Sequence, residues 1–321
     1  MTTSALSLEA RKAAWSKIQR DTFDIATDVT TTGSYVKAKA DGQLVFYNVW
    51  KPKGRIQAEV LFFHGVGEHC MRYEHVFQPF ADAGILVRAI DWRGHGRTVK
   101  KNVPTSVDGY PDTFDQVFQD MLQVYAIDID GVPKDLPLFV FGHSMGGLLA
   151  LSFVQKCKSK LPNLRGCIAQ APALGTGGPF PFFQQLVVNS LGGAFGKISR
   201  PNGLILEGLC SDDAVIEAYI RDPLNHGVFT FRLIKEMAAN IKTLMDDPAK
   251  FTTPLVMYHS ARDRFTVCKA SEKFFNGAGS TDKRFKAFPE EMNLEHEIHN
   301  EPSVNQSIID DYIAWIHERA V

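Results

Sequence analysis

Residues 138–154 read Leu-Phe-Val-Phe-Gly-His-Ser-Met-Gly-Gly-Leu-Leu-Ala-Leu-Ser-Phe-Val. An apolar run typical of a buried strand leads into a glycine-rich turn, and an apolar segment of helical composition follows. Ser144 lies at the centre of a G-x-S-x-G motif in that turn. The glycines permit a tight strand-to-helix turn that holds a serine side chain clear of the sheet. The stretch therefore predicts a reactive serine at a helix N-terminus, with a purely structural turn as the alternative interpretation.

Short apolar runs, each ended by glycine or polar residues, recur on both sides of this stretch at 59–63, 85–90, 164–169 and 255–258. Residues 44–50, which are rich in aromatic and β-branched side chains, and residues 284–288 are also predicted to be strands. Continuous apolar runs of this length are typical of strands buried on both faces. Helical patterns at 114–129 and from about residue 302 onward separate or follow them. Strands that alternate with helices predict a doubly wound, mostly parallel α/β sheet. Ligands of such sheets bind beyond the carboxyl ends of the strands.

The alternation stops between residues 175 and 250, where glycine-rich loops and helical patterns occur without a clear strand. We therefore expect a core formed by residues 1–174 and 251–321. The segment 175–250 is predicted to be a helical cap or lid inserted over the strand ends.

A serine hydroxyl needs a base, normally histidine, and a carboxylate that orients this base. Asp263 follows the run 255–258, which makes it the candidate acid; a loop cap or an ion pair with Arg264 is the alternative. His296 and His299 lie in the loop after 284–288. We expect His296 to be the base and His299 to lie at the surface or at the entry to the last helix.

An acyl-transfer site also needs hydrogen-bond donors aimed at the oxyanion. The backbone N–H of Met145, directly after the serine, is one candidate. The second candidate is the N–H of Val66, in the loop that follows the run 59–63. An ordinary strand-to-helix turn is the alternative interpretation of that loop. The glycines and polar side chains of 91–96 are expected to brace the site.

Composition excludes several other classes of protein. A net charge of −1 over 321 residues offers no basic surface for nucleic acid. The five cysteines are widely spaced and form no CxxC pair, which indicates a reducing compartment and neither a zinc ribbon nor a disulfide framework. The N-terminus shows no secretory signal pattern, so we expect a cytoplasmic protein. Because no phosphate loop, dinucleotide fingerprint or metal-ligand cluster occurs, we expect no cofactor and no metal site.

Taken together, the motifs resemble those of the α/β-hydrolase superfamily, and within it the monoacylglycerol lipase group of S33-type hydrolases. The matching segments are His-Gly-Val-Gly-Glu-His at 64–69 with Arg72-Tyr73, Asp-Trp-Arg-Gly-His-Gly at 91–96, Gly-His-Ser-Met-Gly-Gly at 142–147 and Asp-Pro-Leu at 222–224. Ser260, Thr98 and the long acidic segment 289–295 depart from the usual pattern. The resemblance implies an eight-stranded sheet with a helical cap. It also implies hydrolysis of monoacylglycerol to fatty acid and glycerol by Ser144, His296 and Asp263.

The cap segment 180–191 carries one apolar face, formed by Phe182, Phe183, Leu186, Val187 and Leu191. We expect this face to bind the substrate, a small lipid or ester, by lining its acyl pocket. An amphipathic helix of this kind also suits peripheral contact with a membrane or lipid droplet. Acyl transfer to another alcohol, a carboxylesterase acting on a non-lipid ester and a non-catalytic receptor remain the alternative functions. The sequence predicts no oligomeric state.

Overall fold

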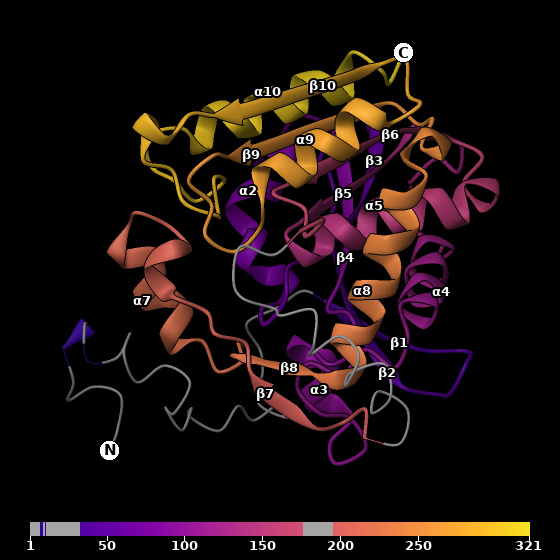
Figure 1. The fold of residues 1–321 in the computed structure, drawn as a ribbon. Helices are drawn as coiled ribbons and strands as arrows, with labels where there is room; N and C mark the ends of the chain where they lie inside the picture. Colours follow the sequence, from indigo (N-terminus) through magenta and orange to yellow (C-terminus); the bar gives the residue numbers. More distant parts are fainter. Residues whose placement is uncertain (1–6, 9, 11–32, 176–194) are drawn as a thin grey trace.

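The computed structural model describes residues 7–8, 10, 33–175 and 195–321 (Figure 1). The predicted amphipathic cap helix at 180–191 therefore lies wholly outside the described residues. In the described ranges, no helix combines the length and the apolar character needed to cross a bilayer.

An eight-stranded sheet forms the centre of the molecule, as predicted. Its spatial order is β1-β2-β4-β3-β5-β6-β9-β10; β1 pairs with β2 and β2 with β4 antiparallel, and all other pairs are parallel. The strands are β1 (Ser34–Lys37), β2 (Leu44–Trp50), β3 (Ala58–Phe63), β4 (Ile85–Ile90), β5 (Leu138–His143), β6 (Leu164–Gln170), β9 (Leu255–Ser260) and β10 (Lys283–Phe288). The predicted mostly parallel sheet of eight strands is thereby confirmed.

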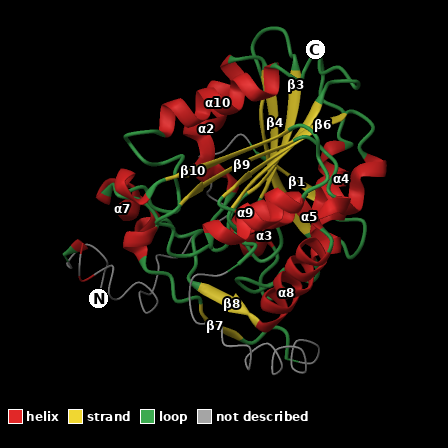
Figure 2. Ribbon diagram, turned by 45° about the horizontal axis from the view of Figure 1, so that its top comes forward, coloured by secondary structure: helices red, strands yellow, loops and turns green. Residues whose placement is uncertain are grey.

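Helices cover both faces of the sheet, which explains why the strand sequences are continuously apolar (Figure 2). In β3, Leu61 and Phe63 pack on one face, and Val60 and Phe62 pack on the other. The first face lies under α4 (Phe114–Tyr125), α5 (Met145–Cys157), α8 (Phe231–Asp246) and α9 (Cys268–Gly277). The second face lies under α2 (Glu74–Asp82) and α10 (Asn305–His317). The short helix α3 (Gly96–Lys101) follows β4.

The insertion differs from its prediction in one respect. Besides α7 (Asp213–Arg221) and α8, it contains a two-stranded antiparallel sheet of β7 (Ser199–Pro201) and β8 (Val228–Thr230). The expectation that no strand occurs in 175–250 was therefore wrong. Each strand has three residues, which is too short to produce a recognisable alternation. Figure 1 shows α7 on the side toward which β9 and β10 point.

Candidate active site

Ser144 occupies a strained turn between β5 and α5. Its backbone adopts φ 58° and ψ −120°, a conformation that is unfavourable for any residue with a Cβ atom. The neighbouring glycines are a steric requirement: a Cβ on Gly142 would lie 2.0 Å from the carbonyl oxygen of Gly146, and one on Gly146 would lie 1.9 Å from that of Phe63. The Ser144 N–H donates to the carbonyl oxygen of Gln170 at 2.9 Å, which ties the turn to β6.

The predicted acid and base lie side by side. His296 Nδ1 is 2.6 Å from Asp263 Oδ2, although the two residues come from different loops at the carboxyl end of the sheet. Asp263 Oδ1 accepts hydrogen bonds from the backbone N–H groups of Phe265 (2.8 Å) and Thr266 (2.9 Å). Arg264 donates to Glu295 instead of pairing with Asp263. The carboxylate is therefore held by its own loop and directed at His296.

Burial and neighbouring charges shift the pKa values of Asp263 and His296 in opposite directions. Burial raises the pKa of Asp263, but the charges and hydrogen bonds of His296 and His259 outweigh it and hold the pKa well below its ordinary value. Burial lowers the pKa of His296, yet the Asp263 carboxylate more than compensates, and the pKa lies above its ordinary value. The geometry thus provides an anionic carboxylate beside a histidine of enhanced basicity.

Ser144, Met145, Val66 and His296 all line one cavity of about 380 Å³. Met145 is the first residue of α5, and N–H groups at this position have no partner within the helix. Val66 lies in the loop after β3, next to the turn of Ser144. The structure therefore brings together all five residues predicted for the triad and the oxyanion donors, with Asp263 directly behind His296.

Contacts with both the core and the cap hold the Val66 loop. Gly65 N–H donates to Glu68 Oε1 at 2.5 Å. The carbonyl oxygen of Gly67 accepts two hydrogen bonds from the insertion, one from the His226 N–H at 2.8 Å and one from the Tyr219 hydroxyl at 3.1 Å. Gly67 has φ +75°, and a Cβ there would lie 2.2 Å from the carbonyl oxygen of His226. The loop shape thus depends on a glycine and on two donors of the cap.

The cap is joined to the core at a further point. His69 Nε2 lies 2.7 Å from Asp222 Oδ2, so that the Asp-Pro-Leu segment of the insertion is anchored to the segment that follows Val66. Arg72 stacks over the ring of Tyr219 at 4.6 Å from its centroid.

Two buried carboxylates and one arginine lie at the His296 end of the cavity. Arg72 forms a two-pronged ion pair with Glu297, with both N···O distances at 2.9 Å, and it also pairs with Glu68. Burial alone would raise the pKa of Glu297, but the Arg72 charge and hydrogen bonds lower it to about 2. Because Glu297 directly follows His296, this ion pair anchors the loop that carries the histidine.

The surface position, one of the two positions expected for His299, was wrong, because its side chain is buried (2% exposed). His299 Nδ1 lies 2.6 Å from Gln170 Nε2, and the same amide nitrogen lies 3.1 Å from His143 Nδ1. An amide NH₂ group can only donate, so each Nδ1 accepts and each neutral ring carries its hydrogen on Nε2. Burial lowers the pKa of both histidines well below the ordinary value. His299 is thus a packed, hydrogen-bonded residue behind the site.

Two of the three departures from the family pattern, Ser260 and Thr98, form defined local hydrogen bonds. Ser260 Oγ donates to the carbonyl oxygen of Leu294 at 2.6 Å and accepts from the Arg262 N–H at 3.1 Å, which links the loop of Asp263 to the loop of His296. Thr98 Oγ1 accepts from the Phe46 N–H at 2.8 Å. Residues 91–96 contact the segment that follows Val66: Asp91 Oδ1 accepts from the Cys70 N–H at 2.9 Å.

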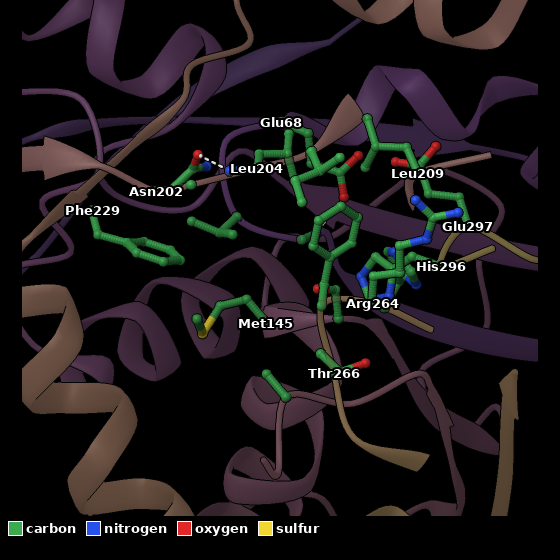
Figure 3. A pocket seen from close by; sticks show the side chains of 18 of the residues that line it. Glu68, Met145, Asn202, Leu204, Leu209, Phe229, Arg264, Thr266, His296 and Glu297 are labelled. Carbon is green, nitrogen blue, oxygen red and sulfur yellow. Dashed lines mark hydrogen bonds between the residues drawn. The ribbon is translucent and has the colours of Figure 1, made fainter. Parts of the chain in front are cut away.

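The predicted substrate-binding residues Phe182, Phe183, Leu186 and Val187 lie outside the described residues. The described part of the insertion lines the cavity with other residues, which the sequence did not single out: Asn202, Gly203, Leu204, Ile205, Leu209, Tyr219, Phe229 and Met237. Figure 3 shows Phe229 and Met145 at one end of the cavity and His296, Glu297 and Arg264 at the other. Met237 could have been predicted from the sequence, because it lies on the amphipathic helix α8. Phe229, on the three-residue strand β8, and the loop residues 202–205 carry no such signal.

Comparisons with known proteins agree with this arrangement. Residues 54–303 match the model of the serine aminopeptidase S33 family of hydrolases. An uncharacterized abhydrolase domain-containing protein of Dictyostelium discoideum is 34% identical over 87% of this chain, but the chain spans only 28% of that protein. A monoacylglycerol lipase of Mycolicibacterium smegmatis is 28% identical, and the match covers 89% of this chain and 98% of the lipase.

The solved structures show the same fold. That of a soluble variant of monoglyceride lipase from Saccharomyces cerevisiae, in complex with a substrate analogue, superimposes with a TM-score of 0.78 at 23% identity and covers 95% of this chain and 100% of that one. The family match spans the loop of Val66, the turn of Ser144, the cap and the loops of Asp263 and His296. The chain belongs to the serine aminopeptidase S33 family, among the serine hydrolases of the α/β-hydrolase fold.

Proposed function

We propose that this chain hydrolyses carboxylic esters, with monoacylglycerols as the substrate class, through an acyl-enzyme formed on Ser144. The observation that carries the proposal is the cavity itself. Ser144 and His296 open onto one space of about 380 Å³, and the hydrogen bond from His296 to Asp263 lies directly behind it. The match to the Mycolicibacterium monoacylglycerol lipase over nearly its whole length supports the choice of substrate class.

In the proposed reaction, His296 Nε2 accepts the hydroxyl proton of Ser144 while Ser144 Oγ attacks the ester carbonyl carbon. The N–H groups of Met145 and Val66 stabilise the negative charge that develops on the carbonyl oxygen. His296 then returns the proton to the departing glycerol oxygen, and the fatty acyl group stays on Ser144. Water, deprotonated by His296, releases the fatty acid and regenerates the serine hydroxyl.

The two ends of the cavity suit the two halves of a monoacylglycerol. Phe229, Met237 and Leu204 offer apolar contact to an acyl chain. At the other end, Glu68, Glu297 and Arg264 present charged groups next to His296, where the hydroxyls of the leaving glycerol would lie. A hydrogen bond from a hydroxyl to a charged group contributes about 1.5–3 kcal/mol, or about tenfold or more in affinity.

The substrate class is tested with two matched series of esters. Glycerol monoesters with acyl groups from butanoyl to oleoyl are compared with the methyl esters of the same acids. We expect kcat/KM to rise with acyl length in both series and to be at least about tenfold higher for the glycerol esters. Free fatty acid should be the product even when an excess of methanol or glycerol competes with water.

Three outcomes would contradict parts of the proposal. Equal kcat/KM in the two series would remove monoacylglycerol as the preferred class and leave a general carboxylesterase. Transfer of the acyl group to the added alcohol as the main reaction would indicate an acyltransferase. Binding of the esters without turnover would indicate a receptor. Contact of the cap with membranes or lipid droplets stays a prediction.

The pH dependence follows from the His296–Asp263 pair. Only unprotonated His296 can accept the serine proton, so kcat/KM should fall as the pH decreases through the pKa of His296. Since Asp263 raises this pKa, the midpoint should lie above the ordinary histidine value of about 6.5. A pH profile of kcat/KM measures it, and Asp263→Asn should move the midpoint to lower pH. A wild-type midpoint at or below the ordinary value would contradict the assignment of the pair.

A further inference from the structure

A second histidine lies against the carboxylate of Asp263. His259, on β9, is fully buried, and its Nε2 lies 3.2 Å from Asp263 Oδ2. The same oxygen lies 2.6 Å from His296 Nδ1. Two imidazole rings therefore share one carboxylate oxygen, and the reaction proposed above uses only one of them.

The hydrogen on His259 can be assigned from its neighbours. Ser271, on α9, is fully buried, and its Oγ lies 2.9 Å from His259 Nδ1. An ionised carboxylate only accepts hydrogen bonds, so the ring nitrogen that faces Asp263 carries the hydrogen and Nδ1 accepts from the serine hydroxyl. Thr266 Oγ1 lies 3.1 Å from the same Nε2 and 2.8 Å from Asp263 Oδ2, which closes a small buried network.

We propose that His259 is a positioning residue that sets the basicity of His296 through the shared oxygen of Asp263. The proposal rests on the proposed function, because it assigns His296 as the base. The His259 Nε2–H holds the carboxylate in the rotation that faces His296 and takes up part of its negative charge. Ser271 holds His259 in the tautomer that can do so.

The direction of the effect follows from elementary electrostatics. A neutral donor on a carboxylate reduces the negative charge available to a second partner. Without the His259 donor, Asp263 would interact more strongly with protonated His296 and would stabilise its charged form. The pKa of His296 would rise, and less of the free base would be present at neutral pH. The carboxylate would keep the hydrogen bonds from Phe265 and Thr266 but lose the contact with His259, which would loosen its alignment with His296 and lower kcat.

Other charged or titratable groups face this pair and remain in place in the variants described below. They are Glu297 and Glu68 at the cavity, His143 at the end of β5, His299 behind the site and Cys268 at the start of α9. Since none of them changes, a shift in the titration of His296 can be attributed to His259.

The experiment compares His259→Leu, which fills most of the volume without a donor, with His259→Gln, whose amide N–H can occupy the place of Nε2–H. Titration of the His296 ring by NMR needs no substrate and reports its pKa directly. We expect His259→Leu to raise the pKa of His296 by about half to one unit and to lower kcat about tenfold with little change in KM. His259→Gln should restore both values toward those of the wild type.

Ser271→Ala keeps His259 but removes the partner of Nδ1, and it should shift the pKa in the same direction by a smaller amount. The melting temperature of each variant reports how much the substitution destabilises the fold. If His259→Leu fails to fold, Ser271→Ala still carries the test. An unchanged His296 pKa in every folded variant, with loss of thermal stability alone, would show that His259 only fills the core. Lack of ester turnover by the wild-type protein would instead overturn the proposed function.

Discussion

Replacement of Ser144 by alanine is expected to lower kcat for ester hydrolysis by about 10⁴-fold or more. In a serine triad the nucleophile and the base act as a unit, so the variant retains only what the oxyanion donors and substrate binding contribute. The fold should be unaffected, because alanine and serine both carry a Cβ atom and bear the same strain at φ 58°. The loss should therefore appear in kcat and not in the melting temperature.

Ser152 provides a matched control on the same helix. It is buried like Ser144, and within the described part of the chain its hydroxyl has no hydrogen-bond partner. Ser152→Ala should leave kcat unchanged and should leave the melting temperature unchanged or slightly higher, since it removes an unsatisfied polar group. Labelling with a fluorophosphonate, located by mass spectrometry, reports the reactive residue. Labelling that persists in Ser144→Ala would disprove the assignment.

His296→Ala should reduce kcat at neutral pH nearly as much as the loss of Ser144, for the same reason. His299→Ala is its control, since both rings are buried and both carry hydrogen bonds. The His299 ring stacks on Tyr73 at 4.8 Å and bonds to Gln170, so its loss should cost about 1–3 kcal/mol of folding free energy. Its effect on kcat should be less than about tenfold.

Steady-state kinetics at saturating substrate, with thermal unfolding of the same preparations, separates the two variants. The expected pattern is loss of turnover with a retained melting temperature for His296→Ala and the reverse for His299→Ala. If His299→Ala abolished turnover while His296→Ala did not, the base would lie three residues further along the loop.

The central strands could be predicted from the sequence because both faces of the sheet are covered. A strand such as β3 is then apolar at every position, and its end is marked by the first polar residue or glycine. The edge strand β1 was missed, because its residues are exposed or half-buried and leave no apolar run. The predicted helix at 114–129 ends at Tyr125 in the structure, and Ile127 packs against the core from the following turn. A prediction from apolar spacing alone therefore placed the C-terminal end of this helix four residues too late.

The candidate triad could be predicted from the sequence because each member follows a strand whose end can be recognised. The residues that support the triad could not be predicted in this way. Arg72 and Glu297 are separated by 225 positions, and only the folded sheet brings them together. His259 is the first polar residue after the apolar run 255–258, but its contact with Asp263 depends on how the loop after β9 turns back. Burial of His299 likewise depends on Gln170 at the end of β6, which no local pattern connects to it.

The two hydrogen bonds from the insertion to the carbonyl oxygen of Gly67 bear on how enzymes of this kind can be recombined. A chimaera that exchanges residues 175–250 as a cassette would replace Tyr219 and His226, the two residues of the insertion that donate to this oxygen. The recipient would then keep its serine, acid and base but lose the support of the Val66 loop. A graft intended to change specificity should therefore transfer the loop at 64–73 together with the insertion, because the two segments support each other's conformation.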